Sequence, residues 1–401
     1  MADRRRLVAN LAAAGLLLAL AAGVLSWQRP WATPGSIGDD TIPGNARSLL
    51  IRQFHQLTAA GTRAEFMAAA GTSDAARATA RDIWDARRAL GVKGARYAYE
   101  RGGDAVDRAD GTTSAQVDVS WRGGSSDVRF RLRPRDDGFD VLSAAPAGHD
   151  PLPVWLAGAV RVARSDGLSV ITIDGGARDL DVTRLARTAV DRVQRVLPSA
   201  GGRLTVVVPK RPQTTAAVLG RRPRQVAHVA ATSAALGGRG GKPAIVLNPA
   251  VFADMDGRAR EIVMAHEATH VLTGVVGHPV ELWVAEGFAD YVALRDDRAP
   301  LDVSAGQILR KVKAQGPPAD LPSAKDFDES AHGLGAAYEA AWLVFRMLGE
   351  RFGETAVRDF YADVVRGTAV EAAAGRRFGL SVAGITSAWR AYLTKSASTV
   401  S

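Results

Sequence analysis

Two histidines and a glutamate stand together in the segment His266-Glu267-Ala268-Thr269-His270. Histidines four residues apart lie on one face of a helix, about one turn from each other, so both imidazoles can bind one ion. Glu267 is rotated about 100° from His266 and faces a water on that ion without filling a ligand position. This pattern predicts a divalent-metal site that hydrolyses a bond with the help of a general base.

The composition restricts the choice of metal. The chain of 401 residues contains no cysteine, so its metal ligands must be His, Asp or Glu. Imidazole and carboxylate ligands with one open position for water suit zinc, and we therefore predict Zn²⁺ as the cofactor. The same absence excludes a disulfide scaffold and thiol catalysis.

A third ligand is expected from a second helix, over residues 280–293. Glu286 lies in this segment, and the fifteen residues between it and His270 are enough for a turn and a return helix. His278 is closer in the sequence, but it lies in the Gly- and Pro-flanked loop between the two helices. We expect Glu286 to complete the site, with His278 as the competing ligand.

Asp290 follows Glu286 by one helical turn and shares its face. A carboxylate there can accept the second ring N–H of His266 or His270, which fixes the tautomer and raises the basicity of the ligand. The alternative for Asp290 is a solvated position on the surface of the helix.

The elements expected around this site alternate between strand and helix and then become helical throughout. Residues 258–272 have an amphipathic helical pattern. The basic, Gly-rich stretch 211–242 predicts an insertion or hairpin with a flexible surface turn. The other expected segments are strands at 168–173, 204–208 and 244–247, and helices at 182–196, 334–348, 354–365 and 381–393.

Residues 45–148 carry a different pattern, in which helical segments precede segments that alternate apolar and polar residues. Helices followed by an antiparallel meander resemble the NTF2-like fold, on the order of elements alone. No chemistry-bearing motif stands out here, so we expect a spacer or binding module.

The first residues predict a membrane span. Arg4, Arg5 and Arg6 precede an apolar run over 7–27, which is long enough to cross a bilayer as a helix. A Pro-, Gly- and Ser-rich linker follows at 28–44. We expect a single-pass cell-membrane protein with its catalytic domain outside the cytoplasm. The alternative is a cleaved signal peptide and secretion.

The net charge of +9 raises the question of an anionic partner. The basic residues are mostly arginines scattered among aspartates, and no stripe of aromatic and basic residues runs along the chain. We therefore predict no nucleic-acid partner. Nothing in the sequence indicates the oligomeric state.

The motif HEATH, followed by the segment WVAEGFADY at 283–291, resembles the gluzincin metallopeptidases, and especially the M1-like family. The resemblance extends over roughly residues 165–395. It implies His266, His270 and Glu286 as zinc ligands and Glu267 as catalytic base. The M1 family usually has Asn where this chain has Ala285, and no Gly-x-Met-Glu-Asn motif lies upstream. An endopeptidase, or a member with another substrate, therefore fits better than an aminopeptidase.

The same resemblance implies two further parts of a site. Gluzincins place an edge strand before the zinc helix, alongside extended substrate. Residues 244–247 hold that place in the order, and a plain core strand is the alternative. Related families also supply an oxyanion donor from a downstream helix, for which Tyr338 and His332 are the two candidates.

The predicted fold class is α+β. The expected order is a transmembrane helix (1–27), a linker (28–44), an NTF2-like module (45–148), a zincin-like metallopeptidase domain (150–395) and a short tail (396–401). The domain at 150–395 is expected to combine a small mixed sheet with a helical C-terminal part. The predicted function is zinc-dependent hydrolysis of a peptide or protein substrate. The alternative is a non-catalytic cell-envelope binding module with a peptidase-like fold.

Overall fold

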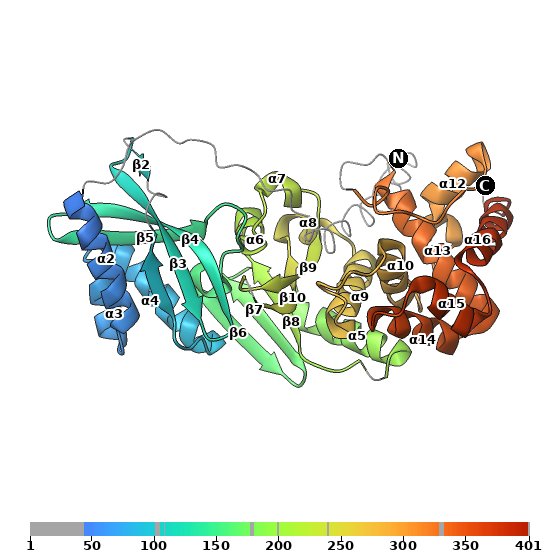
Figure 1. The fold of residues 1–401 in the computed structure, drawn as a ribbon, viewed down its shortest axis with the longest axis horizontal. Coiled ribbons are helices and arrows are strands. Elements are labelled where there is room, and N and C mark those ends of the chain that lie inside the picture. The colour runs from blue at the N-terminus through green and yellow to red at the C-terminus, as the bar shows by residue number, and fades with distance from the viewer. Residues whose placement is uncertain are drawn as a thin grey trace.

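The computed structural model describes residues 44–100, 105–107, 109–176, 180–198, 200–238, 240–328 and 333–399. Figure 1 shows the chain as a row of three parts: a first module at one end, a second sheet in the middle, and a helical part at the other end. The fold is mixed α+β throughout.

The first module packs three helices against an antiparallel sheet. Its strands run in the order β1-β3-β4-β5, with β2 paired to β3. Apolar residues alternate with polar ones along β3 and β4, so one face is buried under the helices. The elements are α2 (Gly44–Ala59), α3 (Arg63–Ala70), α4 (Asp74–Leu90), β1 (Arg96–Tyr99), β2 (Ala105–Asp107), β3 (Thr112–Trp121), β4 (Gly124–Arg135) and β5 (Gly138–Pro146). The NTF2-like resemblance of this module stays a prediction.

The middle part is a mixed five-stranded sheet in the order β6-β7-β8-β10-β9. The central strands β7, β8 and β10 are parallel to one another, whereas β6 and β9 run antiparallel at the two edges. The helices α5 and α9 pack on one face of this sheet. The elements are β6 (Val160–Ser165), β7 (Leu168–Ile173), α5 (Val182–Val196), β8 (Leu204–Pro209), α6 (Pro212–Val218), α7 (Pro223–Val226), β9 (Ala231–Leu236) and β10 (Lys242–Leu247).

Helices make up the rest of the described chain. The helix α9 begins after Asp256, whose side chain accepts the N–H of Ala259, and ends at Gly274 in the left-handed conformation. The other helices are α8 (Pro249–Asp254), α10 (Leu282–Ala293), α11 (Leu301–Ser304), α12 (Gly306–Gln315), α13 (Leu334–Phe352), α14 (Glu354–Val365), α15 (Val370–Phe378) and α16 (Val382–Ala397), with α9 itself at Gly257–Thr273. One apolar core runs from the sheet through α9 and α10 into these helices.

A glycine lets two of these helices approach closely. A Cβ atom on Gly287 of α10 would lie 2.6 Å from the carbonyl oxygen of Ala341 on α13. Only glycine fits at that distance, so α13 supports α10 directly. This contact matters because α10 carries Glu286 and Asp290.

The first module and the middle sheet share a packed seam. Trp155, in the 3-10 turn η2 (Val154–Leu156), is 3% exposed and meets the rings of Tyr97 and Trp121 of the first module edge-on. At the tip of the β3–β4 hairpin, a Cβ on Gly124 would lie 2.6 Å from the carbonyl oxygen of Gly237, which follows β9. The hairpin therefore contacts the turn after the edge strand.

The hairpin expected within residues 211–242 is present as the antiparallel pair β9 and β10, and two short helices precede it. This stretch contains α6 and α7 and then β9, which pairs with β10 along its whole length. The strand at 244–247 is part of β10 and lies between β8 and β9, so it is not the edge strand. The edge strand of the sheet next to α9 is β9.

The expected transmembrane helix is also corrected. In the described part of the chain, no helix combines the length and the apolar character needed to cross a bilayer. The longest, α13, has 19 residues and includes four charged ones, Glu339, Arg346, Glu350 and Arg351. The segment 7–27 on which the prediction rested lies outside the described residues. The described residues thus give no support to the membrane span or to the single-pass localisation predicted from the sequence.

Candidate metal centre

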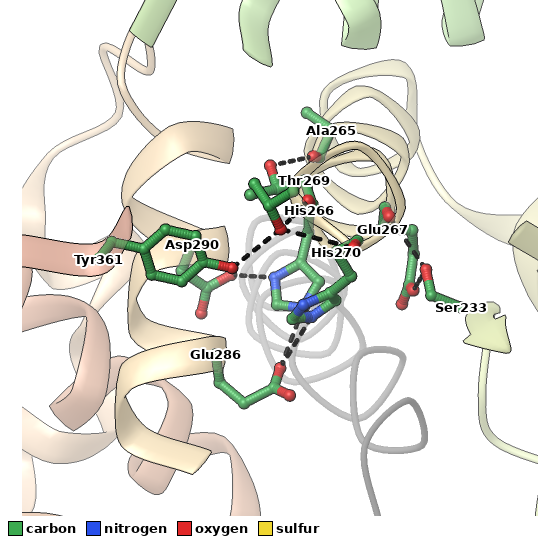
Figure 2. Close-up of polar contacts among 10 residues, drawn as sticks. Ser233, Ala265, His266, Glu267, Thr269, His270, Glu286, Asp290 and Tyr361 are labelled. Atoms are coloured by element: carbon green, nitrogen blue, oxygen red, sulfur yellow. Dashed lines mark hydrogen bonds and ion pairs between the residues drawn. The ribbon is translucent and has the colours of Figure 1, made fainter. Parts of the chain in front are cut away.

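Three ligand-type side chains converge between α9 and α10. His266 Nε2 lies 3.0 Å from His270 Nε2 and 3.1 Å from Glu286 Oε2, and His270 Nε2 lies 3.4 Å from the same oxygen. Figure 2 shows the two imidazoles pointing from α9 toward the Glu286 carboxylate on α10. One atom from each residue can therefore meet at a single point.

Asp290 supports this group from one turn further along α10. Its Oδ1 atom lies 2.8 Å from Nδ1 of His266, on the side of the ring away from Glu286. A carboxylate in this place keeps Nδ1 protonated, so Nε2 is the ring atom that binds a metal once it has released its own proton. Asp290 is 2% exposed, so it is not on a solvated helix face.

Burial and pairing decide the charges of the site. Burial alone would lower the pKa of His266, but Asp290 and Glu286 more than offset this effect and raise that pKa well above its ordinary value. Burial opposes ionisation of Glu286, yet the neighbouring His270 and His266 lower its pKa to about 2. Burial raises the pKa of Asp290, against the attraction of His266. The metal-free protein therefore keeps a cation at His266, where a bound metal would bring its own positive charge.

Glu267 lies on the side of α9 that faces the sheet, next to Ser233. Its Oε2 accepts a hydrogen bond of 2.6 Å from the hydroxyl of Ser233 on β9. Its other oxygen, Oε1, is buried and has no hydrogen-bond partner in the described part of the chain. A carboxylate oxygen left unpaired inside a protein is costly unless a group such as a water or a substrate proton meets it.

Of the other residues predicted for the site, Tyr338 lies close to the three ligand residues. Tyr338 on α13 is buried, with its ring centroid 6.3 Å from that of His266, and its edge packs against Phe327. His278 is exposed in the loop after α9 and does not join the three ligand residues. His332 lies outside the described residues.

Two neighbours of the site were not expected from the sequence. Ser233 is one: the hairpin expected within 211–242 carried no strand bounds, so the sequence did not place this residue. The other is Tyr361 on α14, whose hydroxyl lies 3.0 Å from the Thr273 hydroxyl at the end of α9 and whose ring stacks on Phe288. Burial raises the pKa of the Tyr361 hydroxyl, so the hydroxyl stays protonated and neutral.

The residues present fit zinc. Ligand atoms held tetrahedrally at about 2.0–2.1 Å from zinc lie about 3.3–3.4 Å from one another. The three contacts among His266, His270 and Glu286 are close to that spacing, and all three side chains are buried. In one respect the site departs from a usual zinc centre, because Nδ1 of His270 has no hydrogen-bond partner among the described residues.

Comparisons with known proteins give a limited result. Neither a protein-family model nor a curated protein sequence matches the chain. Among solved structures it is similar to an M1 zinc metallopeptidase from Deinococcus radiodurans, with 14% identity and a TM-score of 0.36. A mutant of an M1 zinc metallopeptidase from the same organism, bound to a Tyr-Ser-Ala substrate, gives 13% identity and a TM-score of 0.34.

These matches cover 70% of this chain and 60–61% of the solved chains, so the protein spans about three fifths of their length. Likeness at this level carries no conclusion about fold or activity.

Proposed function

We propose that this protein is a zinc-dependent metallopeptidase of the gluzincin type. The observation that carries the proposal is the convergence of His266, His270 and Glu286, with ligand atoms 3.0–3.4 Å apart, beside a glutamate that is not itself a ligand. Two helices that pack in one core hold these groups, so the arrangement is set by the fold.

In this proposal His266, His270 and Glu286 hold the metal, and Asp290 orients His266. Bound zinc supplies Lewis acidity for a carbonyl and its attacking water. Glu267 acts as general base, with Oε1 taking the proton of that water, and then returns the proton to the leaving amine as general acid. Because Glu267 is not in the ligand set, its carboxylate is free for both transfers.

Tyr338 is proposed as the oxyanion donor. Its ring centroid lies 6.3 Å from that of His266, and it comes from α13, a different helix from those of the proposed ligands. A phenol O–H close to the metal site can donate to the oxyanion that forms on attack. A Tyr338→Phe variant should therefore lose about 10²-fold in kcat while its zinc content stays unchanged. Unchanged kcat would assign the ring to packing alone.

Glu267→Gln tests the proposal directly. The purified protein and this variant are loaded with zinc, their metal content is measured, and both are given casein and a mixed peptide library. We expect one zinc per chain in each protein. Cleavage by the variant should fall by about 10²- to 10⁴-fold, because the amide cannot accept the proton. Equal cleavage by the two proteins contradicts the role of Glu267.

A zinc-loaded parent that cleaves no peptide would favour the alternative, a non-catalytic binding module with a peptidase-like fold. A parent that does not hold zinc would contradict the ligand assignment. The His270→Ala variant serves as a matched control, since it should lose both metal and cleavage.

A further inference from the structure

Ser233 is a buried polar side chain that the proposed mechanism does not use. Its Oγ lies 2.6 Å from Oε2 of Glu267 and 2.9 Å from the backbone oxygen of Glu267. Both residues are fully buried. Figure 2 shows Ser233 reaching from its strand toward the Glu267 carboxylate, on the side opposite to Glu286.

The sheet fixes where this hydroxyl lies. Ser233 is in β9, and its backbone pairs with Ile245 of β10 in a ladder that runs from Ala231 to Leu236. Successive side chains of a strand point to opposite faces. Ser233 therefore points to the face covered by α9, and Thr232 points to the other. The position of the Ser233 hydroxyl depends on strand pairing, whereas that of Glu267 depends on the helix.

This contact distinguishes the two oxygens of Glu267. A glutamate side chain has three rotatable bonds, so a carboxylate without a partner can present either oxygen in several directions. Here Oε2 is held by Ser233, and Oε1 has no partner among the described residues. The oxygen left for proton transfer is thus a single one, in one orientation.

We propose that Ser233 is a positioning residue for the general base: it holds Oε2 of Glu267 on β9, so that Oε1 faces the reacting water. The proposal rests on the proposed function of Glu267. It links the edge strand to catalysis through a side chain and not only through the strand's backbone. The two hydrogen-bond contacts of the Ser233 side chain described above are both with Glu267.

The test compares three variants of the full-length, zinc-loaded protein. Ser233→Ala removes the hydroxyl, and Ser233→Thr restores a hydroxyl on the same strand. Thr232→Val is the matched control, because it removes the neighbouring buried hydroxyl, whose oxygen has no hydrogen-bond partner among the described residues. Zinc content and thermal unfolding are measured for each protein, together with kcat and KM on one peptide.

We expect Ser233→Ala to lower kcat about 10- to 100-fold with KM and zinc content unchanged, since substrate binding does not depend on the orientation of Glu267. Ser233→Thr should recover most of the loss, and Thr232→Val should match the parent. In a Glu267→Gln background, Ser233→Ala should cause no further loss, because the two side chains act as a unit.

Four results would overturn the inference: a parental kcat for Ser233→Ala, a loss confined to KM, an equal loss in Thr232→Val, or an additional loss on the Glu267→Gln background. If Ser233→Ala fails to fold, Ser233→Cys, which keeps the volume but donates weakly, gives the same comparison. A parent protein without peptidase activity contradicts the proposed function instead. In that case, equal stabilities of the parent and Ser233→Ala would also show that the contact contributes nothing to the fold.

Discussion

At the scale of single residues, the contact between Asp290 and His266 orients the imidazole of one proposed metal ligand. Asp290 contacts Nδ1 of His266, whereas the other proposed ligand atoms gather at Nε2, so the imidazole ring of His266 separates Asp290 from them. Its effect must pass through the ring of His266, whose Nδ1 it holds at 2.8 Å. Such partners adjust the affinity of a metal site without supplying a ligand.

Asp290→Ala is therefore expected to weaken zinc binding by about 10- to 100-fold while leaving one zinc per chain at saturation. Competition with a chromophoric chelator measures this affinity. Asp254→Ala, which removes an exposed carboxylate at the end of α8, serves as the control. Equal affinities in the two variants would mean that Asp290 is only a buried carboxylate.

At the scale of elements, the spacing between α10 and α13 decides whether Glu286 reaches the histidines. Gly287→Ala places a methyl group against the backbone of Ala341, which cannot move aside as a flexible side chain would. We expect the variant to lose about 1–3 kcal/mol of unfolding free energy. It should also lose zinc affinity, since the neighbouring Glu286 moves with the helix.

Gly375→Ala is the control for this prediction. Gly375 lies inside α15, and a Cβ there would meet nothing within 4 Å. Alanine should stabilise that helix by about 0.5–1 kcal/mol. Denaturant unfolding of both variants measures the contrast. A gain in stability in both variants would show that helix propensity, and not the approach of α13, decides the outcome.

Glu339 gives the junction of α12 and α13 a dependence on pH. Its carboxylate accepts the N–H of Ile308 at 2.7 Å, close to the start of α12, but burial dominates and raises its pKa to about 8 from 4.5. The unfolded chain releases this proton near pH 4.5 and the folded chain near pH 8. Between these values the folded state binds more protons, so the free energy of unfolding falls as pH rises.

This contribution is fully present below pH 4.5 and is lost by about pH 8, and the pKa shift corresponds to about 5 kcal/mol at most. Glu339→Gln should remove that part of the pH dependence, because its amide does not ionise. Denaturant unfolding of both proteins at pH 5 and pH 8 measures it. The same fall in stability in both proteins would assign the pH dependence to other groups.

The elements expected from the sequence were those with a strong local pattern. The strands at 168–173 and 204–208 and the helices at 182–196 and 354–365 correspond to β7, β8, α5 and α14. The strand β9, with the sequence ATSAAL, has one β-branched residue and no local preference strong enough to predict it. β9 forms because it pairs with β10, and a short stretch of sequence does not show which strand will be its partner.

The candidate site likewise has a part that the sequence predicts and a part that it does not. The spacing of His266, His270, Glu286 and Asp290 depends on helix periodicity within two neighbouring segments, and the structure brings these four side chains together. The contact of Ser233 with Glu267 joins a helix to a strand 34 residues away. No periodic pattern predicts which strand residue faces a helix when the strand itself is not expected.

At the scale of the whole molecule, the three proposed metal ligands lie inside the largest core of the described residues. The same apolar cluster contains the residues of α9 and α10 beside the ligands, the strands β8 and β10, and the helices α13 to α16. The ligands are therefore joined by packing to most of the chain beyond the first module. A group that binds the folded state alone stabilises all of this structure at once.

Zinc removal is thus expected to destabilise the second half of the protein as a unit. At free zinc about 1,000-fold above its dissociation constant, binding adds about 4 kcal/mol to the free energy of unfolding. Calorimetry with and without a chelator should show a higher unfolding temperature for the loaded protein. Glu267→Gln keeps all three ligands and should show the same zinc-dependent rise, whereas His270→Ala should show none.

Because His266 gains a proton when the metal leaves, the zinc-dependent rise in unfolding temperature should also diminish toward acidic pH. A zinc-dependent rise that persists in His270→Ala would place the metal elsewhere, since in the described chain the other cluster of possible ligands, Glu100, Asp118 and Asp127, lies in the first module.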